Sequence, residues 1–215
     1  SLVAAGRAGS GPGGPGRPVA CGAAEGGDAR VHSELGAHAD FDRLGAAAGE
    51  RHLWVARDLA CQASPEHAWV TEHPSWFYKR PDGTIKYAEN PPKKYEDIYP
   101  LNFHCADWQA LWAEMKSIIL FWAEHGVRII RVDNPHTKPV AFWEYLISGV
   151  REKFPDVIFL AEVFTKPKMM KALATAGFTQ SYTYFTLRTA KRELVDYLHE
   201  LTMTEMSEYF RGPLF

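Results

Sequence analysis

The chain has 215 residues, of which 46% are hydrophobic and 13% aromatic, and this composition indicates a globular protein with one sizeable domain. The formal net charge is −2, so charge gives no general attraction to nucleic acid or to an anionic membrane. No apolar run reaches the length of a membrane-spanning helix, roughly 18 residues or more. The three cysteines Cys21, Cys61 and Cys105 are too few for a disulfide framework and favour a reducing compartment, the cytoplasm.

Residues 1–37 are predicted to be a low-complexity, disordered leader. Their first part consists mainly of Gly, Ala, Pro and Arg without periodicity. Such a segment has too few large apolar side chains to offset the entropy lost on folding. The folded part is therefore expected to span residues 38–215.

The folded part is predicted to begin with a helix over 38–51 and a strand over 52–60. In the helix, Phe41, Leu44 and Ala48 recur at helical spacing and form one stripe. We expect this stripe to face the core.

Residues 61–106 show little regular pattern and contain six prolines. A loop of this length inside a compact domain is usually functional. Asn90, Lys93, Tyr95 and Asp97 fall within eight residues of it. Hydrogen-bond donors and cations at this density suit an anionic ligand such as a sugar phosphate, and a solvated lysine-rich loop is the alternative interpretation.

The clearest helix is predicted over 107–125, with Asp107 as its N-terminal cap and Gly126 as its C-terminal glycine. Large apolar side chains recur along it at helical spacing, which indicates a core-facing stripe. They are Trp108, Leu111, Trp112, Met115, Ile119 and Trp122.

Two short apolar strands, over 128–133 and 157–162, are predicted on either side of a helix over 140–153. Each strand ends on a carboxylate, Asp133 in the first and Glu162 in the second. A strand, helix, strand sequence implies parallel neighbouring strands, so both carboxylates are expected at the same edge of the sheet. Further along, a short helix is predicted over 167–175, a strand within 178–186 and a helix over 191–203.

Two neighbouring carboxylates suit the cleavage of glycosidic bonds, in which one attacks the anomeric carbon and the other protonates the leaving group. Arg131 shares a strand face with Asp133 and is expected to hold it ionised. Apolar Leu160 and Phe164 favour a raised pKa and an acid role for Glu162. As an alternative, Asp133 belongs to a turn or caps the next helix.

No metal site is predicted. His104 and His136 could act as ligands, but no other His, Cys or carboxylate stands at metal-ligand spacing from them. His136 closely follows Asp133 and is a candidate for substrate contact, with a plain hydrogen-bonded histidine as the alternative.

Three segments resemble signature regions of the α-amylase superfamily (glycoside hydrolase family 13). RVDNPHTKP at 131–139 and FLAEVFTKP at 159–167 resemble the second and third regions, and DLACQASP at 58–65 stands in the place of the first. EHPSWFYKRPDGTIKYAENPPKKYEDIYPLNF at 72–103 resembles one subgroup almost throughout, the alpha-1,4-glucan:maltose-1-phosphate maltosyltransferases.

This resemblance implies an α/β fold, namely an incomplete (β/α)8 barrel holding about the third to sixth strands, with a long inserted loop, 61–106, after the third. It implies retaining transfer of maltosyl units from α-maltose 1-phosphate to the non-reducing end of α-1,4-glucans. The full-length form is expected to be a homodimer without cofactor, metal, nucleic-acid or membrane partner.

The resemblance also assigns residues to roles. Asp133 and Glu162 are implied to be catalytic, and the implied substrate-binding residues are Gln62, Asn90, Lys93, Tyr95, Asp97, Arg131 and Asn134. The family's third catalytic carboxylate is expected beyond Phe215, so the chain is expected to be a truncated form that is inactive alone. The alternatives are another glycosidase or a trehalose-forming enzyme of the same superfamily, and a non-catalytic remnant.

Overall fold

The computed structural model describes residues 38–210, so the predicted leader, 1–37, lies outside the described residues. The chain divides into two compact units. Within the described residues, the first unit comprises 38–55 and 59–127, and the second comprises 56–58 and 128–210. None of the helices in this part of the chain has the length and apolar character needed to cross a bilayer.

Helix α1 (His38–Gly49) opens the first unit, as predicted. Its Phe41 ring contacts Trp122 edge-on, with ring centroids 5.1 Å apart. The Leu44 side chain, which we expected on the buried stripe, is 60% exposed. The half-buried positions of the helix are Asp40, Phe41, Gly45, Ala47 and Ala48. The half-buried stripe therefore includes the spacing i, i+4, i+7 from Phe41 and passes beside Leu44.

Helix α3 (Trp108–Glu124) is also present as predicted, and Gly126 follows its C-cap with a φ of +85°, which favours glycine. Asp107 is the N-cap residue, as predicted, but its side chain makes no capping bond. Its carboxylate instead accepts a hydrogen bond from the Trp76 indole at 3.4 Å. The stripe buries Leu111, Met115, Ile119 and Trp122, whereas Trp108 is 40% exposed.

The segment expected to lack regular structure contains several short elements, all in the first unit. Strand β2 (Gln62–Ala63) pairs antiparallel with β5 (Tyr99–Pro100), and β3 (Ala88–Asn90) pairs antiparallel with β4 (Lys93–Tyr95). Two short helices, α2 (Ala68–Glu72) and the 3-10 helix η1 (Pro74–Trp76), bring the Trp69 and Trp76 rings within 5.1 Å of each other. The indoles and the neighbouring Phe77 are buried, so the segment has a small apolar core of its own.

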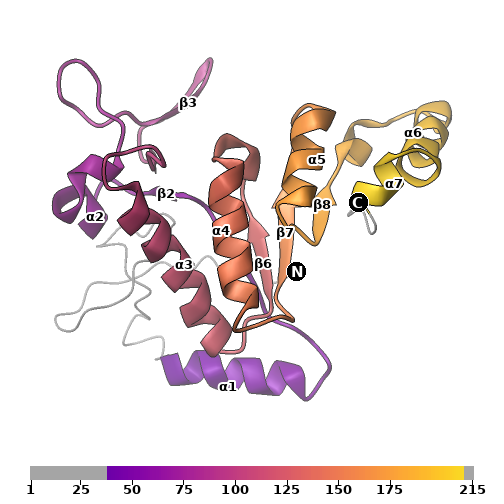
Figure 1. The fold of residues 1–215 in the computed structure, drawn as a ribbon, viewed down its shortest axis with the longest axis horizontal. Helices are drawn as coiled ribbons and strands as arrows, with labels where there is room; N and C mark the ends of the chain where they lie inside the picture. The colour runs from indigo at the N-terminus through magenta and orange to yellow at the C-terminus, as the bar shows by residue number, and fades with distance from the viewer. Residues whose placement is uncertain (1–37, 211–215) are drawn as a thin grey trace. The chain divides into compact units, whose positions relative to one another are not determined.

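A four-stranded sheet organises the second unit, in the order β1-β6-β7-β8 (Figure 1). Its strands are β1 (Ala56–Leu59), β6 (Ile129–Val132), β7 (Ile158–Glu162) and β8 (Gln180–Tyr182). The pairs β6–β7 and β7–β8 are parallel, as predicted for the first of them.

Two of the predicted strands are shorter than expected. The strand predicted over 52–60 begins only at Ala56, because His52 has a φ of +55° and lies in a turn. The strand predicted within 178–186 stops at Tyr182, and the 3-10 helix η3 (Tyr184–Leu187) follows. Both differences arise from turns that local side-chain alternation does not reveal.

Helices α4 (Val140–Arg151) and α5 (Pro167–Thr175) lie on one face of this sheet (Figure 1). The ring of Phe178 links the layers, since its centroid is 5.3 Å from that of Trp143 in α4 and 6.5 Å from that of Phe159 in β7. The predicted helices over 140–153 and 167–175 are therefore confirmed.

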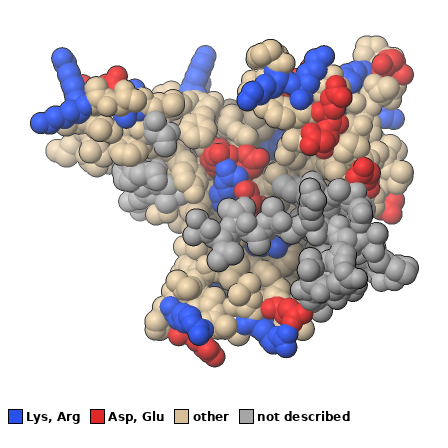
Figure 2. Space-filling model, turned by 180° about the vertical axis from the view of Figure 1, so that it is seen from behind, with Lys and Arg blue, Asp and Glu red and all other residues tan. Residues whose placement is uncertain are grey.

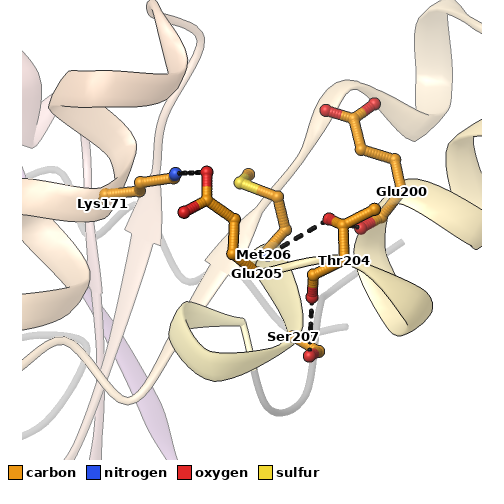
Figure 3. A network of polar contacts seen from close by, with 6 residues as sticks. All are labelled: Lys171, Glu200, Thr204, Glu205, Met206 and Ser207. Atoms are coloured by element: carbon orange, nitrogen blue, oxygen red, sulfur yellow. Dashed lines mark hydrogen bonds and ion pairs between the residues drawn. The ribbon is translucent and has the colours of Figure 1, made fainter.

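Helix α6 (Lys191–Met203), also as predicted, is followed by the short helix α7 (Met206–Tyr209). Thr204 ties the turn between them: its hydroxyl donates to the Glu200 carbonyl at 2.5 Å and accepts from the Met206 amide at 3.2 Å (Figure 3). Lys171 of α5 points toward Glu205 and forms an ion pair with it (Figure 3). These contacts attach the end of α6 to the helix layer beside the sheet.

Candidate active site

The site begins with the alternation of side chains along β6 and β7. In β7, Phe159 and Ala161 are fully buried, while Leu160 and Glu162 are half-buried on the opposite face. The parallel register pairs Val132 with Ala161. Continued by one residue, this register sets Asp133 beside Glu162, so both predicted catalytic carboxylates lie at the C-terminal edge of the sheet.

Asp58, Arg131, Asp133 and Glu162 form a group of charged side chains that we call the carboxylate cluster. The guanidinium of Arg131 connects two carboxylates of this cluster. Its Nη1 is 2.6 Å from Oδ2 of Asp58 at the end of β1, and its Nη2 is 2.7 Å from Oε1 of Glu162. A planar guanidinium can hold two carboxylates at fixed angles, which a lysine ammonium cannot.

Asp58 is a site residue that the sequence analysis did not single out. One observation could have pointed to Asp58: it is the first residue of DLACQASP, 58–65, the segment in the place of the first signature region. Spacing gives no further clue, because Asp58 and Arg131 are 73 residues apart in the chain.

Burial and neighbouring charges shift the pKa values in this cluster. Burial raises the pKa of Glu162, and a hydrogen bond with Asp133 raises it further, while the positive charge of Arg131 acts in the opposite direction. Burial lowers the pKa of Arg131, but the charges of Asp58, Glu162 and Asp133 outweigh this effect and raise it. The direction for Glu162 is the one expected for an acid.

Arg131 acts on Asp133 through its charge and not through one of its two ion pairs. The hydrogen bonds of the guanidinium go to Asp58 and Glu162, and Asp133 follows them only as a weaker electrostatic influence. Oδ1 of Asp133 accepts a hydrogen bond from the Asn134 side-chain amide at 2.8 Å.

Asn134 and His136 shape the turn that follows β6. Asn134 has a φ of +46°, a left-handed conformation that asparagine tolerates better than most residues. It leads into the 3-10 helix η2 (Pro135–Thr137). Burial, followed by the charge of Lys138, lowers the pKa of His136, so its imidazole is neutral at pH 7.

Surface charge alone does not distinguish this cluster. Figure 2 shows acidic and basic side chains interspersed on the face that it draws. The side chains of Arg131 and Glu162 differ from ordinary surface pairs because they are only 29% and 24% exposed. Half-buried charged groups with defined partners are typical of functional sites.

The β3–β4 hairpin of the first unit brings together three of the predicted substrate-binding residues. Asn90 lies opposite Lys93, and Ala88 lies opposite Tyr95, so Asn90, Lys93 and Tyr95 share one face of the hairpin. Glu89 and Lys94 are paired on the other face.

The remaining predicted substrate-binding residues lie elsewhere. Gln62 lies in β2 of the first unit, opposite Pro100, and Asp97 lies in the exposed turn after β4. Arg131 and Asn134 belong to the carboxylate cluster of the second unit.

No group of three or more His, Cys, Asp or Glu side chains that could hold a metal ion occurs within residues 38–210. Cys61 and Cys105 are both buried. Burial raises the pKa of the Cys105 thiol.

The sheet with its carboxylates at the strand ends defines an α/β protein of the α-amylase barrel type. Solved structures have a similar fold. An alpha-amylase from Lactobacillus plantarum matches 81% of this chain and 45% of its own, with a TM-score of 0.64 and 25% identity. An alpha-amylase from Geobacillus thermoleovorans has the same fold, with a TM-score of 0.63 over 78% of this chain and 41% of its own at 16% identity.

Sequence comparison identifies the relatives more narrowly, although no family model matches the chain. An alpha-1,4-glucan:maltose-1-phosphate maltosyltransferase of Rhodospirillum rubrum is 57% identical over 206 residues, which are 96% of this chain and 30% of that protein. The protein of the same name from Chlorobaculum tepidum is 52% identical over 94% of this chain and 30% of its own length. The chain is homologous to these maltosyltransferases and spans about 30% of their length. The resemblance found in the sequence is therefore confirmed.

Proposed function

We propose that the site built by β6 and β7 transfers maltosyl units, with retention of configuration, from α-maltose 1-phosphate to an α-1,4-glucan. The placement of Asp133 and Glu162 at adjacent ends of parallel strands carries this proposal. Retaining glycosidic enzymes place two such carboxyl groups about 5 Å apart on either side of the scissile bond. The names of the homologous proteins indicate the donor and the acceptor.

In the first step, the carboxylate of Asp133 attacks the anomeric carbon of the donor. The bond from that carbon to the phosphate oxygen breaks, and its electron pair leaves with the phosphate, which takes the proton of Glu162. The raised pKa of Glu162 supports this role, because the carboxyl must be protonated before the step.

In the second step, the Glu162 carboxylate takes the proton from the 4-hydroxyl at the non-reducing end of the glucan. The oxygen of that hydroxyl attacks the anomeric carbon, and the ester bond to Asp133 breaks. Two inversions give net retention. Arg131 holds Glu162 in place through both steps, and Asp58 holds Arg131.

We assign donor phosphate binding to the hairpin face formed by Asn90, Lys93 and Tyr95. An amide, an ammonium and a phenol on one face offer the hydrogen-bond donors that phosphate oxygens accept. Gln62, Asp97 and Asn134 are assigned to donor contacts by similarity to the maltosyltransferases alone.

A second candidate is a chain that keeps the carboxylate pair but does not catalyse. It is favoured by the sheet of the described residues, which has four strands, whereas a closed barrel of this type has eight. Activity assays separate the two candidates.

The test uses two proteins. The first is the 215-residue chain alone, and the second is a chimaera, namely the Rhodospirillum rubrum protein with its matching segment of 206 residues replaced by this chain. Each is supplied with maltose 1-phosphate and maltohexaose, and phosphate release is followed. We expect the chimaera to release phosphate and to extend maltohexaose by maltosyl units, and the isolated chain to be inactive.

Asp133→Ala is expected to abolish release, and Asp156→Ala is the matched control. Asp156 is also an aspartate of the second unit, but it lies before β7 and pairs with Arg128 at 2.8 Å. A folded chimaera without phosphate release would favour the non-catalytic candidate. Release by the isolated chain that Asp133→Ala abolishes would show that this chain alone suffices.

A further inference from the structure

A short turn before the β3–β4 hairpin fixes the backbone of Arg80. The Arg80 amide donates to the Thr84 carbonyl at 2.8 Å, and the Arg80 carbonyl accepts from the Gly83 amide at 2.9 Å. Gly83 has a φ of +86°, which is typical of three-residue loops that close with a left-handed residue. The Asp82 carboxylate accepts from the amide and the hydroxyl of Thr84, at 2.9 and 2.7 Å. The turn therefore holds Arg80 in one place.

The side chain of Arg80 links this turn to β3. Its Cζ lies over the ring of Tyr87, 3.9 Å from the ring centroid, which is the geometry of a cation–π contact. Its Nη2 is 3.7 Å from Oε1 of Glu89, which belongs to β3. The Arg80 side chain is only 29% exposed, whereas Lys79 and Lys86 of the same loop are exposed. Arg80 is thus the half-buried cation between the turn and the hairpin.

The contact with Glu89 is made on the side of the hairpin opposite to the proposed phosphate face. In the register of β3 and β4, Glu89 is paired with Lys94, and Asn90 is paired with Lys93 on the phosphate face. Arg80 therefore supports the hairpin without occupying that face. The two strands have only three residues each. A hairpin so short is marginally stable alone, so outside contacts decide how often its binding face is formed.

We propose that Arg80 is a positioning residue that holds the β3–β4 hairpin in the conformation that binds the donor phosphate. It acts through Tyr87 and Glu89 and does not itself touch the phosphate. A ligand that binds only the formed hairpin has a lower apparent affinity when the hairpin is formed less often. The proposal rests on the proposed function, since it concerns the donor of the same reaction. Loss of Arg80 should therefore raise the KM for the donor and leave kcat unchanged.

The experiment measures phosphate release by the chimaera at increasing maltose 1-phosphate and saturating maltohexaose. Arg80→Met keeps the length of the side chain but removes the guanidinium. The KM for maltose 1-phosphate is expected to rise about fivefold, the combined size of one exposed cation–π contact and one surface ion pair. We expect kcat to stay the same, because the carboxylate cluster is built by other strands.

Lys79→Met is the matched control, because it removes one positive charge from an exposed neighbour in the same loop. It should leave the KM unchanged. Equal increases in Lys79→Met and Arg80→Met would overturn the positioning role, since the loop would then attract the donor by its charge alone.

Variants of Tyr87 separate support by contact from attraction by charge, because its ring is uncharged. Tyr87→Leu removes the ring beneath the guanidinium and should raise the KM, whereas Tyr87→Phe keeps the ring and should keep the KM. The double variant Arg80→Met with Tyr87→Leu should lose less than the sum of the two single losses, since both remove the same contact. Equal increases in Tyr87→Phe and Tyr87→Leu would assign the effect to the hydroxyl and overturn the positioning role.

Hydrogen exchange of the chimaera without donor tests the support independently of catalysis. Amides within 86–98 should exchange faster in Arg80→Met than in the unaltered chimaera, and amides of α3 should not change. Unchanged exchange within 86–98 would overturn the positioning role, whatever the activity. Faster exchange together with no phosphate release by the unaltered chimaera would instead overturn the proposed function on which the KM effect rests.

Discussion

Predicted site residues occur in two regions, the carboxylate cluster at the ends of β6 and β7 and the β3–β4 hairpin. The two regions differ in how their side chains are held. In the cluster, side chains from β1, β6 and β7 bond directly to one another through Arg131. In the hairpin, backbone register alone places Asn90, Lys93 and Tyr95 on one face, and the first two are exposed. The side chains of the cluster are therefore fixed before any ligand binds. The hydrogen-bond donors of the hairpin face are solvated and can bind a ligand. We expect changes in the cluster to affect rate and changes in the hairpin to affect affinity.

The largest effect is expected from Glu162→Gln, which removes the group that gives and takes the proton. Maltosyl transfer from maltose 1-phosphate should fall by roughly 10³-fold, within the range of general acid–base catalysis. With α-maltosyl fluoride, whose leaving group needs less protonation, the first step should continue and the maltosyl ester on Asp133 should accumulate. Mass spectrometry of the intact protein would detect that ester.

The exposed Glu144 of α4 serves as the control for this substitution. Glu144→Gln is expected to leave transfer unchanged. Equal losses with both donors in Glu162→Gln would contradict the acid role, because they would show no dependence on the leaving group.

A smaller effect is expected from Arg131→Lys. One ammonium cannot reproduce the two separate contacts at 2.6 and 2.7 Å to Asp58 and Glu162. We expect kcat to fall by roughly 10²-fold, as for substitutions of residues that orient a catalytic group. Arg128→Lys is the matched control, since Arg128 is in the same unit and pairs with the exposed Asp156. If both variants kept full activity, the bridge would have no role in catalysis.

The hairpin provides a comparison of adjacent lysines. Lys93 shares a face with Asn90 and Tyr95, whereas Lys94 is paired with Glu89 on the opposite face. Lys93→Ala should raise the KM for maltose 1-phosphate about tenfold, the value of one charged hydrogen bond. Lys94→Ala should raise it less than about twofold, because an exposed charge outside the proposed binding face contributes little. Equal effects would mean that the whole loop attracts phosphate by charge, without a defined face.

The sequence could predict features that depend on local signals, but not those that depend on packing. The helices over 167–175 and 191–203 were predicted to the residue, because apolar spacing and a leading proline or polar start are local signals. The parallel pairing of β6 and β7 followed from a strand, helix, strand order. By contrast, the turn at His52 and the exposed Leu44 depend on packing, which the spacing of residues does not encode.

The residues of the candidate site also differ in whether local sequence reveals them. Asp133 and Glu162 could be found because each ends a predicted strand. The contact between Arg131 and Asp58 could not be predicted from the sequence. Asp58 lies on a strand 73 residues away and reaches the guanidinium only in the folded sheet. Phe164 was considered only as an apolar neighbour of Glu162, and its ring contact with Tyr184 could not be predicted, because Tyr184 follows a different strand.

The smallest effect concerns the titration of Glu162. Asp133 raises the pKa of Glu162 through a hydrogen bond and through its charge. Asp133→Asn removes that charge, so the pKa of Glu162 should fall toward its ordinary value. Carbon-13 NMR of glutamate-labelled protein would follow this titration, with Glu162→Gln used to assign the signal.

Stability should respond with the same sign. Because the folded-state pKa of Glu162 lies above its unfolded value, the fold binds the extra proton and loses stability as the pH rises from about 4.3 to the folded-state pKa. In Asp133→Asn this loss should be smaller, and urea unfolding across that window would measure it. Asp156→Asn, which changes a carboxylate that does not act on Glu162, should leave the titration of Glu162 in place. A Glu162 signal that titrates at the same pH in Asp133→Asn would contradict the coupling, and with it the adjacent placement of the two carboxyl groups on which the mechanism depends.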